Sequence, residues 1–171
     1  MRKYNVESIK LLKEIQDTSK HQELLPQRVQ NDITFRDIEK RRDELGSLFN
    51  LNKSNNKYNL MYLLLSLYTY QPPLRMDYKD MAIVKTVPKN KKLNYIWDNN
   101  GKYKIIIRND KVIKSHGAII LDLNDKLNNI INDSLNAFPR DNILSTQNDG
   151  SKPLNKQGFE SLLYYCFPDK K

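Results

Sequence analysis

Leu93-Asn-Tyr-Ile-Trp-Asp-Asn-Asn-Gly-Lys-Tyr-Lys-Ile-Ile-Ile-Arg108 is the stretch of sequence that decides the fold of this chain. Two segments rich in Ile, Tyr and Trp flank Asp98-Asn-Asn-Gly101. β-branched and aromatic residues favour strands, and Asn and Gly tolerate the positive φ angles of a tight turn. The stretch therefore predicts a β-hairpin that turns at Asp98–Gly101.

Further strands are predicted on both sides of this hairpin, because the hydrophobic period changes after Met81 and stays strand-like to residue 123. Asn109-Asp110 is a second, weaker turn signal. The predicted strands are Ala82–Val87, Leu93–Asp98, Lys102–Arg108 and Ala118–Leu123. Their order favours a small antiparallel sheet of three or four strands.

Helices are predicted before and after this sheet. Tyr58–Tyr68 is apolar nearly all round, which is typical of a helix buried on all sides, and Gln71-Pro-Pro73 ends it. A short turn is expected over Met76–Met81. Asn124 is an expected N-cap for a helix that runs to about Ala137, and Asn155–Phe167 is the last predicted helix. The segment 139–153 between those two helices is predicted to be a loop.

The N-terminal 50 residues predict a helical arm. Apolar residues recur at helical spacing over residues 4–18, and a polar linker follows. Thr34 and Asp37 have the spacing of a capping box, which predicts a helix to about Phe49. Its inward residues are expected to be Phe35, Ile38, Leu45 and Leu48. Lys40, Arg41 and Arg42 lie together on this helix and are compatible with a clamp around DNA or with a solvated basic face.

These elements predict an α+β fold, in which helices flank a small antiparallel sheet. We expect two regions. Residues 1–50 form the N-terminal helical arm, and residues 51–171 form the second region. A chain of 171 residues is long enough to bury a core without disulfides or metal.

The net charge of +9 is concentrated in residues 85–114, which carry nine basic and two acidic residues. Such a local field attracts polyanions, and nucleic acid is its commonest physical partner. The alternatives are an acidic protein, an anionic membrane surface, or a solvated lysine-rich surface from a genome biased towards Lys and Asn. The predicted DNA-binding residues are Lys85, Lys89, Lys91, Lys92, Lys102, Lys104, Arg108 and Lys114.

Several classes of protein and of site are not supported by the sequence. There is no Gly-rich phosphate loop, Cys166 is the sole cysteine, and His21 and His116 stand far apart, so we expect no metal and no cofactor. The longest apolar stretch, Leu60–Tyr68, is about half of a membrane span, and the N-terminus lacks the apolar core of a signal peptide. These features predict an intracellular protein that is neither secreted nor bound to a membrane.

Two further stretches of the sequence have recognisable motifs. The first is Leu67-Tyr-Thr-Tyr-Gln-Pro-Pro-Leu-Arg-Met-Asp-Tyr78, and the second is Asn109-Asp-Lys-Val-Ile-Lys-Ser-His-Gly-Ala-Ile-Ile-Leu-Asp-Leu123. They resemble the first-arginine box and the lysine hairpin of tyrosine recombinases, the superfamily of the phage-type integrases, in the versions found in large DNA viruses, virophages and mobile elements. The resemblance covers about residues 58–165. It implies that the second region is the N-terminal part of a recombinase catalytic domain and that residues 1–50 are either an arm or the end of a core-binding domain.

The resemblance also implies a chemistry that needs no metal. In the family a tyrosine attacks a DNA phosphodiester, two arginines and a histidine stabilise the phosphate charge, and the hairpin lysine protonates the leaving oxygen. Arg75 matches the first arginine, and Lys111 matches the lysine, with Lys114 as its nearest competitor. From the residues themselves, Arg75 follows a rigid double proline. It is either a held phosphate ligand or an ordinary surface arginine paired with Asp77 or Asp80.

The sequence departs from the family in the second box, His-x-x-Arg. Gln-Glu-Leu follows His21 and Gly-Ala-Ile follows His116, so neither histidine supplies this box. Tyr164 and Tyr165 precede the place where the box would stand, and their helix has core-like spacing, so we expect them to be core residues rather than nucleophiles. The acidic residue expected three places after the first arginine is Tyr78 here.

Three functions follow from these features. The first is a DNA-binding recombinase fragment, truncated before the second box and inactive by itself. The second is a half-enzyme that needs another recombinase chain to supply the histidine, arginine and tyrosine. The third is a non-enzymatic interaction or regulatory protein of a virus or mobile element.

Overall fold

The computed structural model describes residues 33–72, 74, 77–90, 93–108, 118–146 and 149–169. Contacts within the chain place Thr34–Lys170 in one compact unit. The helix and linker expected over residues 4–32 lie outside the described residues. The domain boundary expected after residue 50 stays a prediction, and the helix before it belongs to this compact unit.

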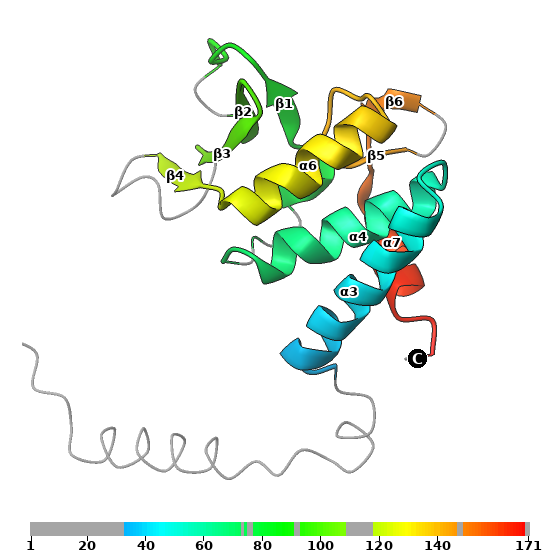
Figure 1. Cartoon of the computed structure of the whole chain (residues 1–171). Coiled ribbons are helices and arrows are strands. Elements are labelled where there is room, and N and C mark those ends of the chain that lie inside the picture. Colours follow the sequence, from blue (N-terminus) through cyan, green and yellow to red (C-terminus); the bar gives the residue numbers. More distant parts are fainter. Residues whose placement is uncertain are drawn as a thin grey trace, which may run out of the picture. The chain divides into compact units, whose positions relative to one another are not determined.

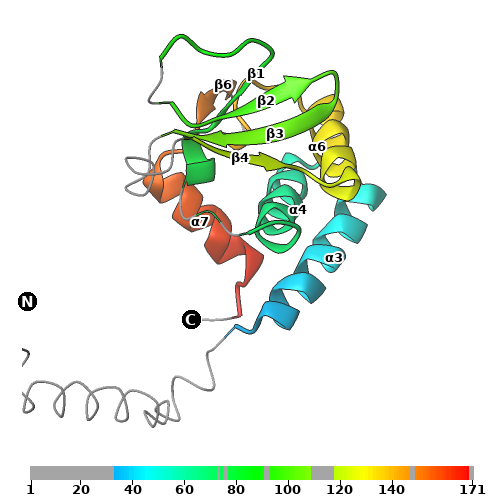
Figure 2. The same cartoon turned by 90° about the vertical axis from the view of Figure 1, so that its left-hand side faces the viewer.

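The described part of the unit has a layer of helices beneath a sheet, which confirms the predicted α+β class (Figures 1 and 2). Its helices are α3 (Phe35–Leu51), α4 (Asn56–Thr69), α6 (Asp125–Ala137) and α7 (Lys156–Cys166), with a short 3-10 helix η1 (Asp77–Asp80). Its strands are β1 (Ala82–Val84), β2 (Tyr95–Asn99), β3 (Lys102–Ile107), β4 (Ile119–Asp122), β5 (Ser145–Thr146) and β6 (Asp149–Pro153).

Each helix begins with a side-chain cap, which satisfies backbone N–H groups that have no partner in the first turn. The capping box predicted for α3 is present, because Thr34 Oγ1 accepts from Asp37 N and Asp37 Oδ2 accepts from Thr34 N. The predicted cap of α6 is also confirmed, with Asn124 Oδ1 accepting from Leu127 N at 2.9 Å. These caps explain why both helices begin where the sequence predicts.

Helix α4 is the central element of the core, as predicted. Leu63 is fully buried and Leu65 is 2% exposed, and residues two positions apart in a helix point in roughly opposite directions, about 200° apart. Full burial of one such leucine side chain stabilises a fold by about 1.5–3 kcal/mol. The helix is therefore surrounded by other elements, and these elements include α3, α6 and α7.

Helix α3 packs on α4 mostly through the predicted stripe, because Leu45 is buried and Ile38 and Leu48 are partly buried against the core. Phe35 was also expected to point inward but is 56% exposed, and Gly46, which was not predicted, is buried. A Cβ atom on Gly46 would stand 2.8 Å from the Tyr62 ring, so the two helices approach closely at this glycine. Phe35 lies in the first turn of α3, about three turns before this contact, and its side chain is not packed into the core.

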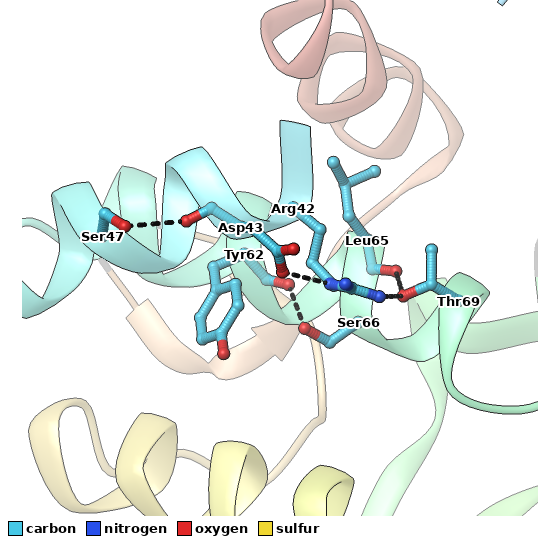
Figure 3. A network of polar contacts seen from close by, with 7 residues as sticks. All are labelled: Arg42, Asp43, Ser47, Tyr62, Leu65, Ser66 and Thr69. Carbon is cyan, nitrogen blue, oxygen red and sulfur yellow. Dashed lines mark hydrogen bonds and ion pairs between the residues drawn. The ribbon is translucent and has the colours of Figure 1, made fainter. Parts of the chain in front are cut away.

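The guanidinium of Arg42 is part of the α3–α4 interface, so the prediction that it shares a solvated or DNA-clamping face is wrong (Figure 3). Arg42 is 5% exposed. Its Nε donates to Asp43 Oδ1 at 2.8 Å and its Nη1 donates to Thr69 Oγ1 at 2.9 Å. Thr69 in turn donates to Leu65 O at 2.8 Å. This arginine ties α3 to the end of α4 and is not available to a ligand.

The main sheet has the order β1-β2-β3-β4 and is mixed rather than wholly antiparallel. The predicted hairpin is confirmed, with Asn99 opposite Lys102 and positive φ angles at Asn100 (54°) and Gly101 (82°). β3 and β4 are also antiparallel. β1, however, pairs with β2 in parallel. The ten-residue connection between these two strands is long enough for the chain to return to the starting edge, which a short hairpin loop cannot do.

The segment 139–153 is not a loop, as predicted, but contains strands β5 and β6. Asn142 also forms an antiparallel bridge with Ala82, and Ile83 N donates to Asp141 O at 2.8 Å. Gly150 allows the segment to fold on itself, because a Cβ there would stand 2.8 Å from Pro139 O. The two strands are very short, and the segment is held by contacts with β1, which is about 60 residues away in the sequence. No local sequence pattern therefore predicts these strands.

Candidate nucleic-acid interface

The cations of β3 stand on one side of the sheet. Along the strand, Tyr103, Ile105 and Ile107 belong to the hydrophobic core that α4 and α6 share. Successive side chains of a strand point to opposite faces. Lys102 and Lys104 therefore lie on the opposite side, with Ile106. We call this side, turned away from the helices in Figure 2, the outer face.

Aromatic residues of β2 share the outer face with these cations. The register pairs Trp97 with Lys104 and Tyr95 with Ile106. The guanidinium carbon of Arg108 lies 5.1 Å from the centroid of the Tyr95 ring, within the range of a cation–π contact. Trp97 Nε1 donates to Lys85 O at 3.3 Å, which fixes the indole against the connection that follows β1. The outer face is thus both basic and aromatic.

One of the predicted DNA-binding lysines is already paired with an acid. Lys104 Nζ lies 2.7 Å from Asp122 Oδ1, on the strand opposite. Both side chains are more than a third exposed, so water and salt weaken this pair. A phosphate could still bind Lys104, but it would first have to displace the Asp122 carboxylate. Binding to an unpaired lysine does not have this free-energy cost.

Lys85, Lys89 and Lys102 are exposed, and within the described residues none of them has a carboxylate at ion-pair distance. These three and Arg108 carry the available positive charge of the predicted set. Lys91, Lys92 and Lys114 lie outside the described residues, as do the predicted catalytic residues Arg75 and Lys111.

The described residues that flank Arg75 and Lys111 are joined by one side chain, Asn94. Its Nδ2 donates to Asp77 Oδ1 at 3.3 Å, and its Oδ1 accepts from Arg108 N at 2.8 Å. Asp77 stands two residues after Arg75, and Arg108 stands three residues before Lys111. The chain therefore leaves the segment of Arg75 and enters the segment of Lys111 at residues that Asn94 links by hydrogen bonds.

The turn that leads to Arg75 is held in place as far as it is described. Tyr78, fully buried, accepts a hydrogen bond from Gln71 Nε2 and donates to Leu67 O at 3.4 Å. Asn124 Nδ2 donates to Tyr70 O at 3.1 Å. These contacts connect the turn to α4 and α6 and restrict its motion.

The tyrosines of this turn are structural. The ring of Tyr68 stands edge-on to Tyr78, with the centroids 5.5 Å apart. Burial, and to a smaller extent the carboxylate of Asp77, raises the pKa of Tyr68 to about 12. Burial likewise raises the pKa of Tyr78. Both phenols are therefore protonated at neutral pH and are poor nucleophiles.

Two asparagines of α6 hold the hairpin against the helices. Asn128 Oδ1 accepts from Tyr103 N at 2.8 Å, and Asn128 Nδ2 donates to Leu123 O at 3.0 Å. Asn132 Nδ2 donates to Gly101 O at 3.0 Å and its Oδ1 accepts from the Tyr103 hydroxyl at 2.7 Å. The asparagines were expected to reflect compositional bias, so the contacts of Asn128, Asn132 and Asn94 were not predicted. Their place on the inward face of a predicted helix is the signal that could have found Asn128 and Asn132.

Tyr164 and Tyr165 are not core residues, so that expectation is wrong. They are 52% and 46% exposed on α7, which belongs to the helical layer (Figure 2). Lys57 Nζ lies 3.4 Å from the centroid of the Tyr165 ring. The buried side of α7 is formed by Phe159, Leu162 and Cys166 instead.

The described residues contain no group of three or more His, Cys, Asp or Glu side chains that could hold a metal ion. Both histidines lie outside the described residues. Cys166 is buried, and burial raises the pKa of its thiol to about 12, so the thiolate is not populated at neutral pH. In the same part of the chain, no helix is both long enough and apolar enough to cross a lipid bilayer.

Comparison with known proteins gives no relative: no protein family, no curated protein and no solved structure matches this chain. The functional argument therefore depends on the outer face and on the residues that hold it.

Proposed function

We propose that this chain binds DNA through the outer face of its sheet, mainly by contacts to backbone phosphates. The observation that carries the proposal is the alternation in β3, which puts Lys102 and Lys104 on the side away from the helices, where Arg108 lies over the Tyr95 ring. Lysine and arginine release condensed counterions when they contact phosphates, and this release drives binding without sequence preference.

The resemblance to tyrosine recombinases extends this proposal to a partial active site. Arg75 is proposed to grip a phosphate, and Lys111 is proposed to lie beside it. The support for this pairing is Asn94, which bonds to residues near both of them. With no His-x-x-Arg box, the chain is proposed to be inactive by itself, and a second recombinase chain would supply the missing groups.

The salt dependence of duplex binding tests the proposed phosphate contacts. Lys85 and Lys102 are the best residues to change, because both are exposed and have no carboxylate at ion-pair distance among the described residues. We expect the double variant Lys85→Glu with Lys102→Glu to bind less tightly. The slope of log affinity against log salt should be smaller by about two, since each phosphate contact contributes roughly 0.9.

The matched control is Lys156→Glu, whose side chain is 71% exposed on α7, away from the outer face. It changes net charge in the same direction and should leave the slope within about 0.3 of the wild-type value. If the salt slope changes by the same amount per reversed charge in the control and in the double variant, the outer face is not the binding surface. Affinity that does not depend on salt would reject phosphate binding altogether.

A further inference from the structure

The chain's one tryptophan stands on the outer face and not in the core. Large aromatic side chains normally lie in the core, where they bury much apolar surface. Here the core and the partly buried residues packed against it include Tyr58, Tyr62, Tyr68 and Tyr70, but not Trp97. Trp97 is partly exposed. Its position is therefore not explained by packing.

The indole is also held in a fixed orientation. Its N–H donates to Lys85 O, and its strand neighbours are Val84 on β1 and Lys104 on β3. The side chain comes from the middle of β2, between two strands, so it stands on the sheet and does not project from a loop. Tyr95 and Ile106 on the same face are nearly fully buried, so the partly exposed Trp97 is the aromatic side chain of β2 that a ligand can reach.

A second stacking surface lies two residues away on the same strand. Tyr95 is only 2% exposed, and the guanidinium of Arg108 lies over its ring. A guanidinium stacked on an aromatic ring can present its other side to a second planar group. Residues two apart in a strand are separated by roughly 6.6–6.8 Å. That is about twice the 3.4 Å between stacked bases in one strand of a duplex.

This spacing, with aromatic and guanidinium groups standing among cations, favours an unpaired strand over a duplex. In a duplex the base faces are stacked on one another, and a flat sheet reaches only phosphates and groove edges. Aromatic side chains among cations bind single strands because every base has a π-face. Four-stranded sheets that present aromatic residues on an open face are a known platform for splayed bases.

From this geometry we infer a binding site for single-stranded DNA on the outer face, where one base stacks on Trp97 and the next on Arg108. The cations Lys85, Lys89 and Lys102 contact the phosphates of that strand. The inference depends on the proposed DNA binding and adds a preference for unpaired bases, which phosphate contacts by themselves do not produce.

The fluorescence of Trp97 tests the inference directly, because no other tryptophan contributes to the signal. Wild-type protein is titrated with a thymidine oligonucleotide and, separately, with a duplex of equal length, while anisotropy of a labelled strand reports binding. We expect the oligonucleotide to quench the indole emission as it binds. The duplex should bind with little change in emission.

Variants separate stacking from charge. We expect Trp97→Ala to weaken binding of the single strand by about fivefold or more and to leave duplex affinity and salt slope unchanged. Trp97→Phe, which keeps a ring, should retain most of the affinity. Lys102→Glu should weaken both ligands, because it removes a phosphate contact that they share.

The outcomes distinguish this inference from the proposed function. Salt-dependent binding of both ligands without quenching, or an equal loss for both in Trp97→Ala, would overturn base stacking and keep phosphate binding. Absence of salt-dependent binding to either ligand would overturn both. The titration of wild-type protein decides between these outcomes even where a variant fails to fold.

Discussion

Gly101 is the residue on which the geometry of the hairpin depends most directly. Asn100 and Gly101 both have positive φ angles, which a two-residue turn between antiparallel strands requires. A β-branched residue strongly disfavours this conformation, whereas glycine adopts it readily. Asp98 Oδ1 also accepts from Gly101 N at 2.8 Å, which closes the turn.

We predict that Gly101→Val lowers the free energy of unfolding by about 1–3 kcal/mol. Valine at a positive φ angle is strained, and this strain destabilises the folded state relative to the unfolded state. Urea denaturation followed by circular dichroism measures this change. The control is Lys102→Val at the neighbouring exposed position, where a strand residue is favoured. If both variants are equally stable, the positive φ at residue 101 is not a constraint.

The buried phenol of Tyr68 predicts how stability depends on alkaline pH. Its pKa is raised to about 12 in the folded chain from the ordinary value of 10.0, so the folded state holds the proton more tightly than the unfolded state. The stability from this group is present below about pH 10 and is lost as pH rises from about 10 to about 12. Cys166, with its pKa raised from 9.0 to about 12, adds a loss that begins about one pH unit lower.

We expect Tyr68→Phe to flatten this alkaline loss in denaturation experiments between pH 9 and pH 12, since phenylalanine has no proton to release. Tyr164→Phe, at a half-exposed position on α7, is the control and should leave the profile unchanged. An identical alkaline profile for Tyr68→Phe and wild type would contradict the assigned environment of Tyr68.

Asn94 is the link between two elements, η1 and the end of β3. We predict that Asn94→Ala accelerates hydrogen exchange of the Arg108 amide, which then lacks its acceptor, and leaves the amide of Ile105 in the middle of β3 unchanged. The variant should also weaken DNA binding, because Arg108 and the predicted catalytic segments are then less well held. Exchange measured by NMR or mass spectrometry checks the first effect.

The control for this variant is Asn129→Ala, at an exposed position of α6. It should change neither the exchange of Arg108 nor DNA binding. Slower or unchanged exchange at Arg108 in Asn94→Ala would show that Asn94 does not hold the end of the strand.

Elements with strong local signals were the ones that the sequence predicted well. Three of these signals are the capping box at Thr34, the turn at Asn100-Gly101 and the cap at Asn124. In each case the residues that form the local structure are only a few positions apart, so a short stretch of sequence is enough to predict it. The parallel pairing of β1 with β2 follows a ten-residue crossover, and β1 also bridges to Asn142, 60 positions away. β5 and β6 are very short strands, so no local sequence pattern predicts these pairings.

Candidate site residues were predictable in part. The local charge predicted Lys85, Lys89, Lys102 and Arg108 among the DNA-binding residues. The three lysines are exposed with no carboxylate at ion-pair distance among the described residues, and Arg108 is partly exposed. The pairing of Lys104 with Asp122 required knowledge of the register between β3 and β4. The burial of Arg42 depended on how α3 meets α4, which hydrophobic spacing within one helix does not specify.

On the scale of the whole molecule, the described unit has two sides with different roles. The helical layer contains the core, including the fully buried Leu63 and Leu64. The outer face of the sheet has exposed cations and the tryptophan. Proteins that bind nucleic acid by charge commonly separate a structural side from a basic side in this way.

The absence of a second catalytic box from the sequence leads to a prediction for the complete reaction. We expect the chain by itself to form no covalent adduct with DNA. Mixed with a polypeptide that carries a His-x-x-Arg box and a tyrosine nucleophile, it should form adducts that survive denaturing electrophoresis. Arg75→Ala should abolish these adducts, because in the proposed site the Arg75 guanidinium stabilises the negative charge on the reacting phosphate.

Two results would contradict this prediction. Adducts formed by the chain without a partner, and lost on changing Tyr164 or Tyr165 to phenylalanine, would make α7 the source of a nucleophile. Adducts that persist in the mixture with Arg75→Ala would remove the role proposed for that arginine.

The most direct test of the central claim is a map of the DNA-contacting residues by NMR. Titration of labelled protein with a short DNA should shift the amide signals of β2, β3 and the connection after β1, including Lys85, Trp97 and Lys102, and leave α3 and α7 unchanged. Shifts concentrated on α3 or α7, with the sheet signals unchanged, would contradict the assignment of DNA binding to the outer face.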